Sequence, residues 1–334
     1  MKQIVAVPLD YMACGELRIA NPARFMQMMG MDITLLPATK FRGVYQDNII
    51  FTQRLITNEV IGLIKKLKDQ LNCKVVVDYD DMIWTYKGEG LPEYNHCKSK
   101  VNCDANAKAM KDGLNDVADA VICTNEYLKV SLSEFVPLDK ITVIPNMLPV
   151  NQWMIDKKVT VPSKDIFLFA GSNTHFDNEN KLPGDFSKGL IHYLQNKQVI
   201  TAGDPPYFIN PAAKVPLTPM SIYSSVFRQY TNSCKFILAP LADNVFNKSK
   251  SDLKYLESCA VGRVCLCNDF EDSPYSNAHP YQKIPVDATS QTIEFIVERA
   301  KKHYGEILEY QYEYIKQRWL ENHLQDYIDI FNKL

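Results

Sequence analysis

The chain has 334 residues, of which 46% are apolar and 23% are charged, and its formal net charge is −2. This length fits two domains better than one, and the composition excludes a disordered or low-complexity protein. The net charge gives no general support for binding to nucleic acid or to an anionic membrane, although a local basic groove is compatible with it.

The N-terminal stretch is too short and too quickly polar to be a signal peptide, and it predicts a first strand at residues 3–7 instead. No run of the chain approaches the ~20 apolar residues that span a bilayer. We therefore expect a cytoplasmic protein without a transmembrane segment.

Short apolar runs alternate with helical patterns in the first half, which predicts a parallel sheet covered by helices. Strands are expected at residues 3–7, 33–37, 48–52, 74–78, 120–123 and 141–144. Helices are expected near residues 22–30, 58–71, 102–117 and 126–135. The prediction for residues 1–150 is a Rossmann-like domain.

The nine cysteines follow no regular framework. Cys97 and Cys103 are six residues apart, with His96 beside them, but a zinc site would need further ligands in pairs. We therefore expect no metal site and reduced thiols throughout.

Prolines and polar residues from 146 to 164 predict a linker, after which a second α/β domain begins. Its strands are expected at residues 166–170, 199–201, 236–239 and 264–267, with a helix at residues 250–260 and a helical tail from 290. The second domain is assigned to residues 151–309, and the terminal helix, 310–334, is expected to join the first domain. Two Rossmann-like domains that face each other place ligands at the carboxyl ends of their strands.

Residues 244–269 combine a loop, a helix and a strand. Ser249 is the predicted N-cap of the helix and Asp252 its capping-box partner. Lys250, Lys254 and Glu257 follow a spacing that places them on one helical face. Free N–H groups at the helix start favour a diphosphate, and Glu257 can accept two hydrogen bonds from a ribose diol. The alternative is a capped amphipathic helix whose charges are only solvated.

The same run contains a pattern of the form F-N-x-x-K-S-x-x-K-x-x-E followed by a small-residue turn. It resembles the donor-binding segment of family-4-type retaining glycosyltransferases, which have the GT-B fold, and in particular a subgroup from bacteria and phages. The matching positions are Phe246, Asn247, Lys250, Ser251, Lys254, Glu257 and Gly262. The resemblance implies that Glu257 binds the donor ribose and that Asn247, Ser249, Ser251 and Lys254 contribute to the donor site.

One position departs from the broader family, which has a second glutamate where this chain has Ser249. Asp243, at the start of the loop, is the candidate to replace that glutamate. The resemblance also implies that Lys250 stabilises the leaving diphosphate, so Lys250 and Asp243 are candidate catalytic residues.

Two further motifs lie in the first domain. Gly15 and Arg18 follow the first strand in a C-G-x-x-R pattern that resembles the N-terminal loop of these enzymes. Gly15 would permit a tight turn, and Arg18 would contact a phosphate or the acceptor. Asp80 and Asp81 follow a buried strand and are expected to line the acceptor side. Their carboxylates also fit Mg²⁺, which the family does not generally need, and capping of a helix is the simpler role for Asp81.

The start of the second domain, residues 169–175, resembles the first strand and loop of the donor domain. Gly171 and Ser172 would let the backbone approach the phosphates or the sugar. His175, the third candidate catalytic residue, would hydrogen-bond a phosphate or a substrate hydroxyl, and Asp177 is a weaker candidate. A structural histidine is the alternative.

The resemblance implies sugar transfer from a nucleotide-diphosphate sugar, such as a UDP-sugar, with retention of configuration and with no required cofactor. For the acceptor the resemblance implies 5-hydroxymethylcytosine in phage DNA, hence the host cytoplasm, because compact enzymes of this subgroup occur in phages and place sugars on that base. Lysines and arginines at residues 40–42, 65–68 and 98–100 would give a basic face for the DNA, from which the base would have to be extruded. The alternatives are a surface glycan or lipid-linked sugar as acceptor, a nucleotide-sugar epimerase, and a binding protein without catalysis.

Overall fold

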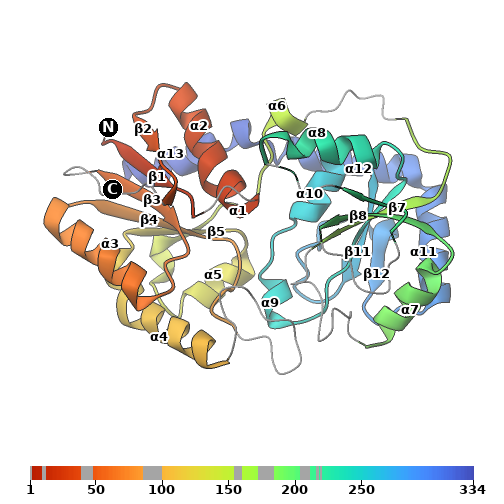
Figure 1. Cartoon of the computed structure of the whole chain (residues 1–334), viewed down its shortest axis with the longest axis horizontal. Coiled ribbons are helices and arrows are strands. Elements are labelled where there is room, and N and C mark those ends of the chain that lie inside the picture. Colours follow the sequence, from red (N-terminus) through yellow and green to blue (C-terminus); the bar gives the residue numbers. More distant parts are fainter. Residues whose placement is uncertain are drawn as a thin grey trace.

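The computed structural model describes residues 2–9, 13–38, 48–85, 100–153, 160–171, 184–203, 211–215, 218 and 220–334. The chain forms two α/β lobes that lie side by side, each built on a six-stranded parallel sheet (Figure 1). Within the described residues, no helix is both long and apolar enough to cross a membrane.

The N-terminal lobe has a sheet in the order β2-β1-β3-β4-β5-β6. Its strands are β1 (Ile4–Val7), β2 (Ile33–Leu35), β3 (Ile49–Gln53), β4 (Lys74–Tyr79), β5 (Ala120–Cys123) and β6 (Ile141–Val143). Its helices are α1 (Ala13–Gly15), the π-helix η1 (Glu16–Ala20), α2 (Asn21–Met28), α3 (Asn58–Leu71), α4 (Lys100–Val117), α5 (Glu126–Leu132) and the 3-10 helix η3 (Leu138–Lys140). All six strands predicted for this half are present.

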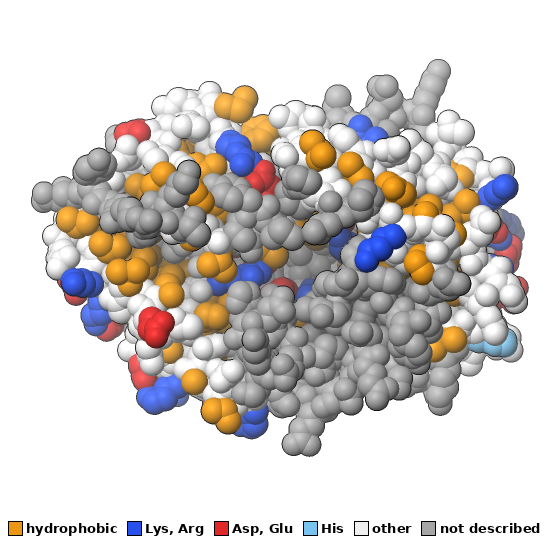
Figure 2. All heavy atoms as spheres, in the orientation of Figure 1, with side chains coloured by type: hydrophobic (Ala, Val, Ile, Leu, Met, Phe, Trp, Pro, Cys, Tyr) orange, Lys and Arg blue, Asp and Glu red, His pale blue; other side chains and the backbone are white. Residues whose placement is uncertain are grey.

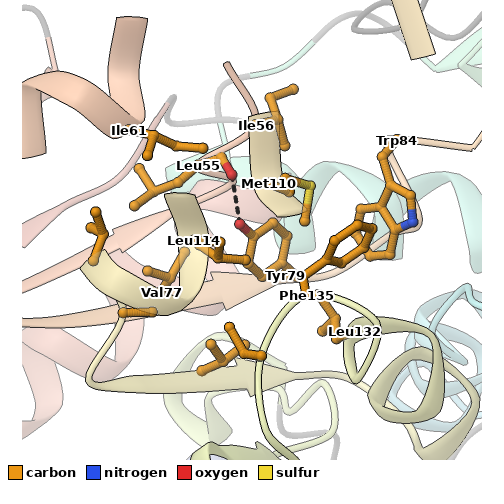
Figure 3. Close-up of a cluster of buried hydrophobic side chains, with 14 of the residues drawn as sticks. Leu55, Ile56, Ile61, Val77, Tyr79, Trp84, Met110, Leu114, Leu132 and Phe135 are labelled. Atoms are coloured by element: carbon orange, nitrogen blue, oxygen red, sulfur yellow. Dashed lines mark hydrogen bonds between the residues drawn. The ribbon is translucent and has the colours of Figure 1, made fainter. Parts of the chain in front are cut away.

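Alternate residues of each strand face opposite sides of this sheet, so two separate cores form. On one face, β3, β4 and β5 pack against α3, α4 and α5 in the cluster shown in Figure 3. There the Tyr79 hydroxyl donates a hydrogen bond to the Leu55 carbonyl at 2.7 Å, and Trp84 packs edge-on against Phe135. On the other face, the strands pack against α2 and the last helix, α13 (Leu324–Asn332).

The C-terminal lobe has a sheet in the order β12-β11-β10-β7-β8-β9. Its strands are β7 (Ile166–Gly171), β8 (Gln198–Gly203), β9 (Ala213–Val215), β10 (Phe236–Ala239), β11 (Val264–Asp269) and β12 (Lys283–Pro285). Its helices are α6 (Val150–Trp153), α7 (Gly184–Leu194), α8 (Met220–Thr231), α9 (Val245–Lys248), α10 (Leu253–Ala260), η6 (Pro280–Gln282), α11 (Ser290–Lys302) and α12 (Tyr304–Lys316). The connections reverse direction between β7 and β10, which makes the carboxyl ends of these two strands the topological switch point.

After α12 the chain crosses back through the 3-10 helix η7 (Leu320–Asn322) and places α13 on the N-terminal sheet (Figure 1). Phe51 of β3 packs against the rings of Tyr327 and Phe331 at centroid distances of 6.1 and 5.4 Å. The last segment of the chain thus completes the core of the first lobe.

Two sequence-based expectations are wrong. The helix predicted at residues 250–260 begins only at Leu253, and a separate short helix, α9, precedes it. The cysteines are not all reduced: within the part of the chain that the structure describes, seven are free thiols, but Cys103 is disulfide-bonded.

Candidate functional site

The switch point of the C-terminal lobe is where the predicted donor residues lie. β7 ends at Gly171, which pairs with Gly203 of β8, and the connection after it contains Ser172, His175 and Asp177, which lie outside the described residues. The connection after β10 contains the remaining donor candidates, from Asp243 to Glu257. A ligand bound at this switch point would contact both connections.

Two short helices shape the connection after β10. Asn244 caps α9, because its side-chain oxygen accepts a hydrogen bond from the Asn247 N–H at 2.8 Å. Ser249 ends α9 and does not start α10; Asp252 precedes α10 but makes no side-chain capping bond. The predicted capping box is therefore wrong, since Asp252 bonds elsewhere. Gly262 ends the turn after α10 at φ 63°, as the sequence predicted.

Glu257 is the most enclosed of the acidic and basic side chains predicted for the donor site. It is 2% exposed, and its Oε2 accepts a hydrogen bond from Lys254 Nζ at 2.8 Å. This bond engages Oε2 and does not involve Oε1, the second oxygen of the carboxylate. Burial lowers the pKa of Lys254, but the charges of Glu257 and Tyr223 outweigh it and keep that pKa above its ordinary value. Lys254 therefore holds the Glu257 carboxylate in place.

Lys250 lies at the contact between the lobes. Its ammonium is 3.8 Å from a carboxylate oxygen of Asp81 and 4.6 Å from the centre of the Phe246 ring. Both charged side chains are largely buried, at 12% and 13% exposure. Figure 2 shows basic and acidic side chains next to one another where the two lobes meet. The structure thus brings a predicted donor residue and a predicted acceptor-side residue together.

Ser249 and Asn247 are buried in contacts within the protein. The Ser249 hydroxyl donates to the Phe246 carbonyl at 2.7 Å and accepts from the Met82 N–H of the N-terminal lobe at 3.1 Å, and the residue is 0% exposed. Asn247 donates to the Ala242 carbonyl at 2.9 Å. Ser249 is thus held by both lobes, and its contribution to the donor site stays a prediction.

Asp243 is the most exposed of these candidates. Its side chain is 44% exposed and lies 3.6 Å from Lys248 Nζ. The structure gives it no contact with Lys250, Lys254 or Glu257, so its replacement of the family glutamate stays a prediction.

Arg18 is enclosed in the N-terminal lobe. Its guanidinium is 1% exposed and donates two bonds from Nε and one from Nη2 to the Asp78 carboxylate, the shortest at 2.7 Å. Nη1 donates to the Ile144 carbonyl and to the side chain of Asn146. A contact between Arg18 and a phosphate stays a prediction, and it would require this buried network to open. Gly15 is helical, with φ −64°, and does not form the tight turn that its residue type suggested.

Asp80 lies at the carboxyl end of β4 and accepts a two-pronged ion pair from Arg54, with both N···O distances at 2.7 Å. Burial raises the pKa of Asp80, but the charge and hydrogen bonds of Arg54 outweigh burial and lower that pKa to about 2. The thiol of Cys14 also contacts this carboxylate, and burial holds the pKa of Cys14 well above its ordinary value. Asp80 is therefore a fixed anion and not a proton carrier at neutral pH.

Sequence reasoning missed three residues of this region: Arg54, Asn125 and Arg318. Arg54 has an unusual left-handed backbone, with φ 53°, directly after β3. Asn125 follows β5 as Asp80 follows β4, and this position at the carboxyl end of a strand is the signal in the sequence that points to it. Arg318 lies more than sixty residues beyond Asp252 in sequence, and no local pattern links the two. Among the described residues, no group of three His, Cys, Asp or Glu side chains forms a metal site.

Known proteins match this chain in structure but not in sequence. No protein-family model matches it, and no curated protein matches it by sequence. HepE of Anabaena, solved in complex with UDP-glucose, is 11% identical and superposes with a TM-score of 0.62 over 100% of both chains. The lipopolysaccharide outer core galactosyltransferase WaaB, in its apo form, is 13% identical with a TM-score of 0.56 over 100% of both chains.

A glycosyltransferase from Rickettsia africae ESF-5 is 12% identical, with a TM-score of 0.55 over 99% of this chain and 98% of that one. The chain therefore has the GT-B fold, two Rossmann-like lobes with parallel sheets, and the fold class predicted from the sequence is confirmed.

Proposed function

We propose that the protein is a glycosyltransferase that moves a sugar from a nucleotide-diphosphate sugar to a hydroxyl acceptor with retention of configuration. The observation that supports this most is the position of Glu257 and Lys250: both belong to the connection that leaves β10 at the switch point of a GT-B lobe. The full-length structural likeness to HepE, whose structure contains UDP-glucose, supports a UDP-sugar as the donor.

The described geometry suggests a role for each donor residue. Oε1 of Glu257 is suited to accept hydrogen bonds from a ribose diol, and the ion pair with Lys254 keeps the carboxylate oriented. Lys250 and the N–H groups at the start of α10 would bind the diphosphate. They would also stabilise the charge that develops on it as the sugar bond breaks. Binding of the diphosphate would take Lys250 from Asp81.

The remaining candidates keep the roles proposed from the sequence. Gly171, Ser172 and His175 are assigned to the phosphates and sugar, and Asp243 to the sugar. Gly15, Arg18 and Asp80 are assigned to the acceptor side, where Arg18 and Asp80 act through the ion pairs that they form. Ser251 belongs to the donor segment. The reaction needs no bound metal, and closure of the two lobes would exclude water from the donor.

For the acceptor we propose 5-hydroxymethylcytosine in phage DNA, which would place the enzyme in the host cytoplasm. One observation favours the alternative, a surface glycan or a lipid-linked sugar. Three lysines of the proposed basic face are ion-paired: Lys65 with Asp116, Lys68 with Asp119 and Lys100 with Asp104, at 2.7–2.9 Å. Lysines that are paired with carboxylates attract a polyanion such as DNA less strongly than unpaired lysines do.

A panel assay tests the activity and the acceptor together. The protein is incubated with UDP- and GDP-sugars, with hydroxymethylated DNA, unmodified DNA, a lipid-linked sugar or no acceptor, and products are followed by mass spectrometry. Sugar on hydroxymethylated DNA alone supports the proposal, and sugar on the lipid-linked acceptor supports the alternative. Isomerised nucleotide sugar without acceptor would indicate an epimerase, and tight binding without turnover a binding protein.

Replacement of Glu257 tests the donor site directly. Glu257→Gln keeps the shape but removes the charge, so we expect the Kd for UDP to rise at least about tenfold, since hydrogen bonds to a charged group contribute ~1.5–3 kcal/mol. Isothermal titration calorimetry measures the Kd for UDP of the variant and of the wild type. Glu313→Gln is the matched control, because Glu313 also pairs with a lysine three positions away on a helix but is 65% exposed on α12. An unchanged Kd in Glu257→Gln contradicts the proposed donor site.

A further inference from the structure

Residues 249–252 bind the N-terminal lobe through a continuous set of buried polar contacts, which we call the seam. The Met82 N–H donates to Ser249 Oγ at 3.1 Å. The side-chain amide of Asn125 donates to the carbonyls of Ser249 and Lys250, both at 2.9 Å. The seam thus fixes the backbone on both sides of the Lys250 side chain, and it does so from the opposite lobe.

Asn146, in the connection between the lobes, extends the seam. Its amide nitrogen donates to Ser251 Oγ at 2.7 Å, while its side-chain oxygen accepts from Arg18 Nη1 at 3.2 Å. Arg18 is in turn locked to Asp78 at the end of β4. Asn146 therefore ties the donor segment to the buried Arg18–Asp78 ion pair of the N-terminal lobe.

Arg318, between α12 and α13, holds the other end of the seam. Nη1 and Nη2 each donate to one carboxylate oxygen of Asp252 at 2.9 Å, and Nε and Nη2 donate to the Asn146 carbonyl at 3.1 and 2.6 Å. The Tyr314 hydroxyl donates to Asp252 and accepts from Arg318, both at 2.7 Å. Arg318 and Asp252 are only 12% and 10% exposed. A planar guanidinium is suited to bind a carboxylate and a carbonyl at once in fixed geometry.

We propose that Arg318 and Asn146 are positioning residues for the donor segment: together they hold Ser251 and Asp252, and thereby place Lys250 and Glu257 for the nucleotide. This inference rests on the proposed function. Asp252 directly precedes α10, so its position sets the start of the helix that presents Glu257 one and a half turns later. Lys250 lies between the Asn125 and Asn146 contacts, so a shift of the seam moves its ammonium too.

The physical reason for a large effect is that the seam is buried. Removal of the guanidinium leaves the Asp252 carboxylate and the Asn146 carbonyl without their main donors in a site that water reaches poorly, and the segment must then rearrange to solvate them. Displacements of about 1 Å in positioning groups are enough to reduce catalysis by about two orders of magnitude.

The test measures UDP affinity by titration calorimetry, turnover with the active donor, and thermal stability for each variant. Arg318→Gln is expected to raise the Kd for UDP about tenfold and to lower kcat as well, because both Lys250 and Glu257 are displaced. Arg318→Lys should recover part of the affinity through a single hydrogen bond to Asp252.

The matched control is Arg263→Gln. Arg263 is 3% exposed and donates to the carbonyls of Thr231, Gly262 and Asn232 at the amino end of β11, away from the switch point. The Arg263→Gln variant should lose about as much stability as Arg318→Gln but keep the wild-type Kd for UDP. If Arg263→Gln and Arg318→Gln weaken UDP binding equally, Arg318 is merely structural and the inference is wrong.

A double-mutant cycle tests the joint action of the two residues. Asn146→Ala alone is expected to raise the Kd about fivefold, and the double variant should be little worse than Arg318→Gln, because both changes release the same segment. Fully additive effects would contradict a shared role.

Two outcomes separate this inference from the proposed function. If the wild-type protein binds no nucleotide diphosphate, the proposed function fails. If it binds UDP and folded Arg318→Gln binds equally well, only the inference fails. Should Arg318→Gln not fold, Tyr314→Phe removes one hydrogen bond to Asp252 and should raise the Kd two- to threefold; an unchanged Kd there overturns the inference.

Discussion

At the scale of single residues, Asp80 shows how a buried charge is kept ionised. Burial alone would favour the neutral acid, but Arg54 provides two hydrogen bonds and a full opposite charge, and the pKa of Asp80 falls to about 2. Because the folded pKa lies below the ordinary value, Asp80 contributes stability above about pH 4, and this contribution is lost as the pH falls through about 2.

This gives a pH-dependent prediction. The difference in free energy of unfolding between the wild type and Asp80→Asn should shrink by about 2 kcal/mol between pH 5 and pH 2, the amount expected from the pKa difference. Urea denaturation at a series of pH values measures it. A difference that stays constant over this range would show that Arg54 does not hold Asp80 ionised.

How much of the site could be predicted from the sequence also depends on the residue. Glu257 and Lys250 are predicted as donor residues because the chemistry of a donor site and the spacing of the motif agree. The predicted N-cap role of Ser249 is wrong because one of its two hydrogen bonds comes from the Met82 N–H, which lies far away in sequence, and the other goes to the Phe246 carbonyl. The same limit applies to Arg18: the residue type was informative, but its partner, Asp78, is a long-range contact.

At the scale of helices and strands, the elements with a clear local pattern are predictable from the sequence and those without one are not. The N-terminal strands and α3 follow local apolar periodicity and caps, such as the Thr57 side chain that accepts from the Val60 N–H. By contrast, β9 and β12 have three residues each and have no periodic signal. The start of α10 was misplaced because Asp252, the apparent capping-box residue, is bound by Arg318.

The end of α10 offers a prediction at this scale. Gly262 adopts φ 63°, so Gly262→Ala should lower the free energy of unfolding by about 1 kcal/mol through backbone strain. Gly62→Ala is the control: this glycine lies inside α3 with open space around it, and alanine there should raise stability by ~0.5–1 kcal/mol. Chemical denaturation of both variants measures these changes, and two changes of the same sign would contradict the assignment.

At the scale of the whole molecule, the lobes are joined by an apolar contact as well as by the seam. Phe246, from α9 of the C-terminal lobe, is 1% exposed and belongs to the N-terminal core cluster that contains Tyr79, Trp84 and Phe135. Figure 1 shows α9 between the two lobes. The aromatic position of the donor motif is therefore a docking residue.

Phe246→Ala should lower the free energy of unfolding by about 3 kcal/mol, as expected for a fully buried phenylalanine, and should uncouple the two lobes. Differential scanning calorimetry should then resolve two transitions where the wild type shows one. Phe295→Ala on α11, where the ring is 66% exposed, should change stability by less than about 0.5 kcal/mol. A single transition at the wild-type temperature in Phe246→Ala would contradict this role.

The return of α13 to the first sheet has a consequence for how the protein is made. The face of that sheet formed by Ile4, Phe51 and Val76 is covered by Leu324, Tyr327 and Phe331, which the ribosome adds only after the entire second lobe. Domains generally fold in the order of their synthesis. Here, one apolar face of the first lobe's sheet stays uncovered until α13 has been synthesised. The second lobe, although translated later, can complete its own cores first, so the order of maturation is the reverse of the order of translation.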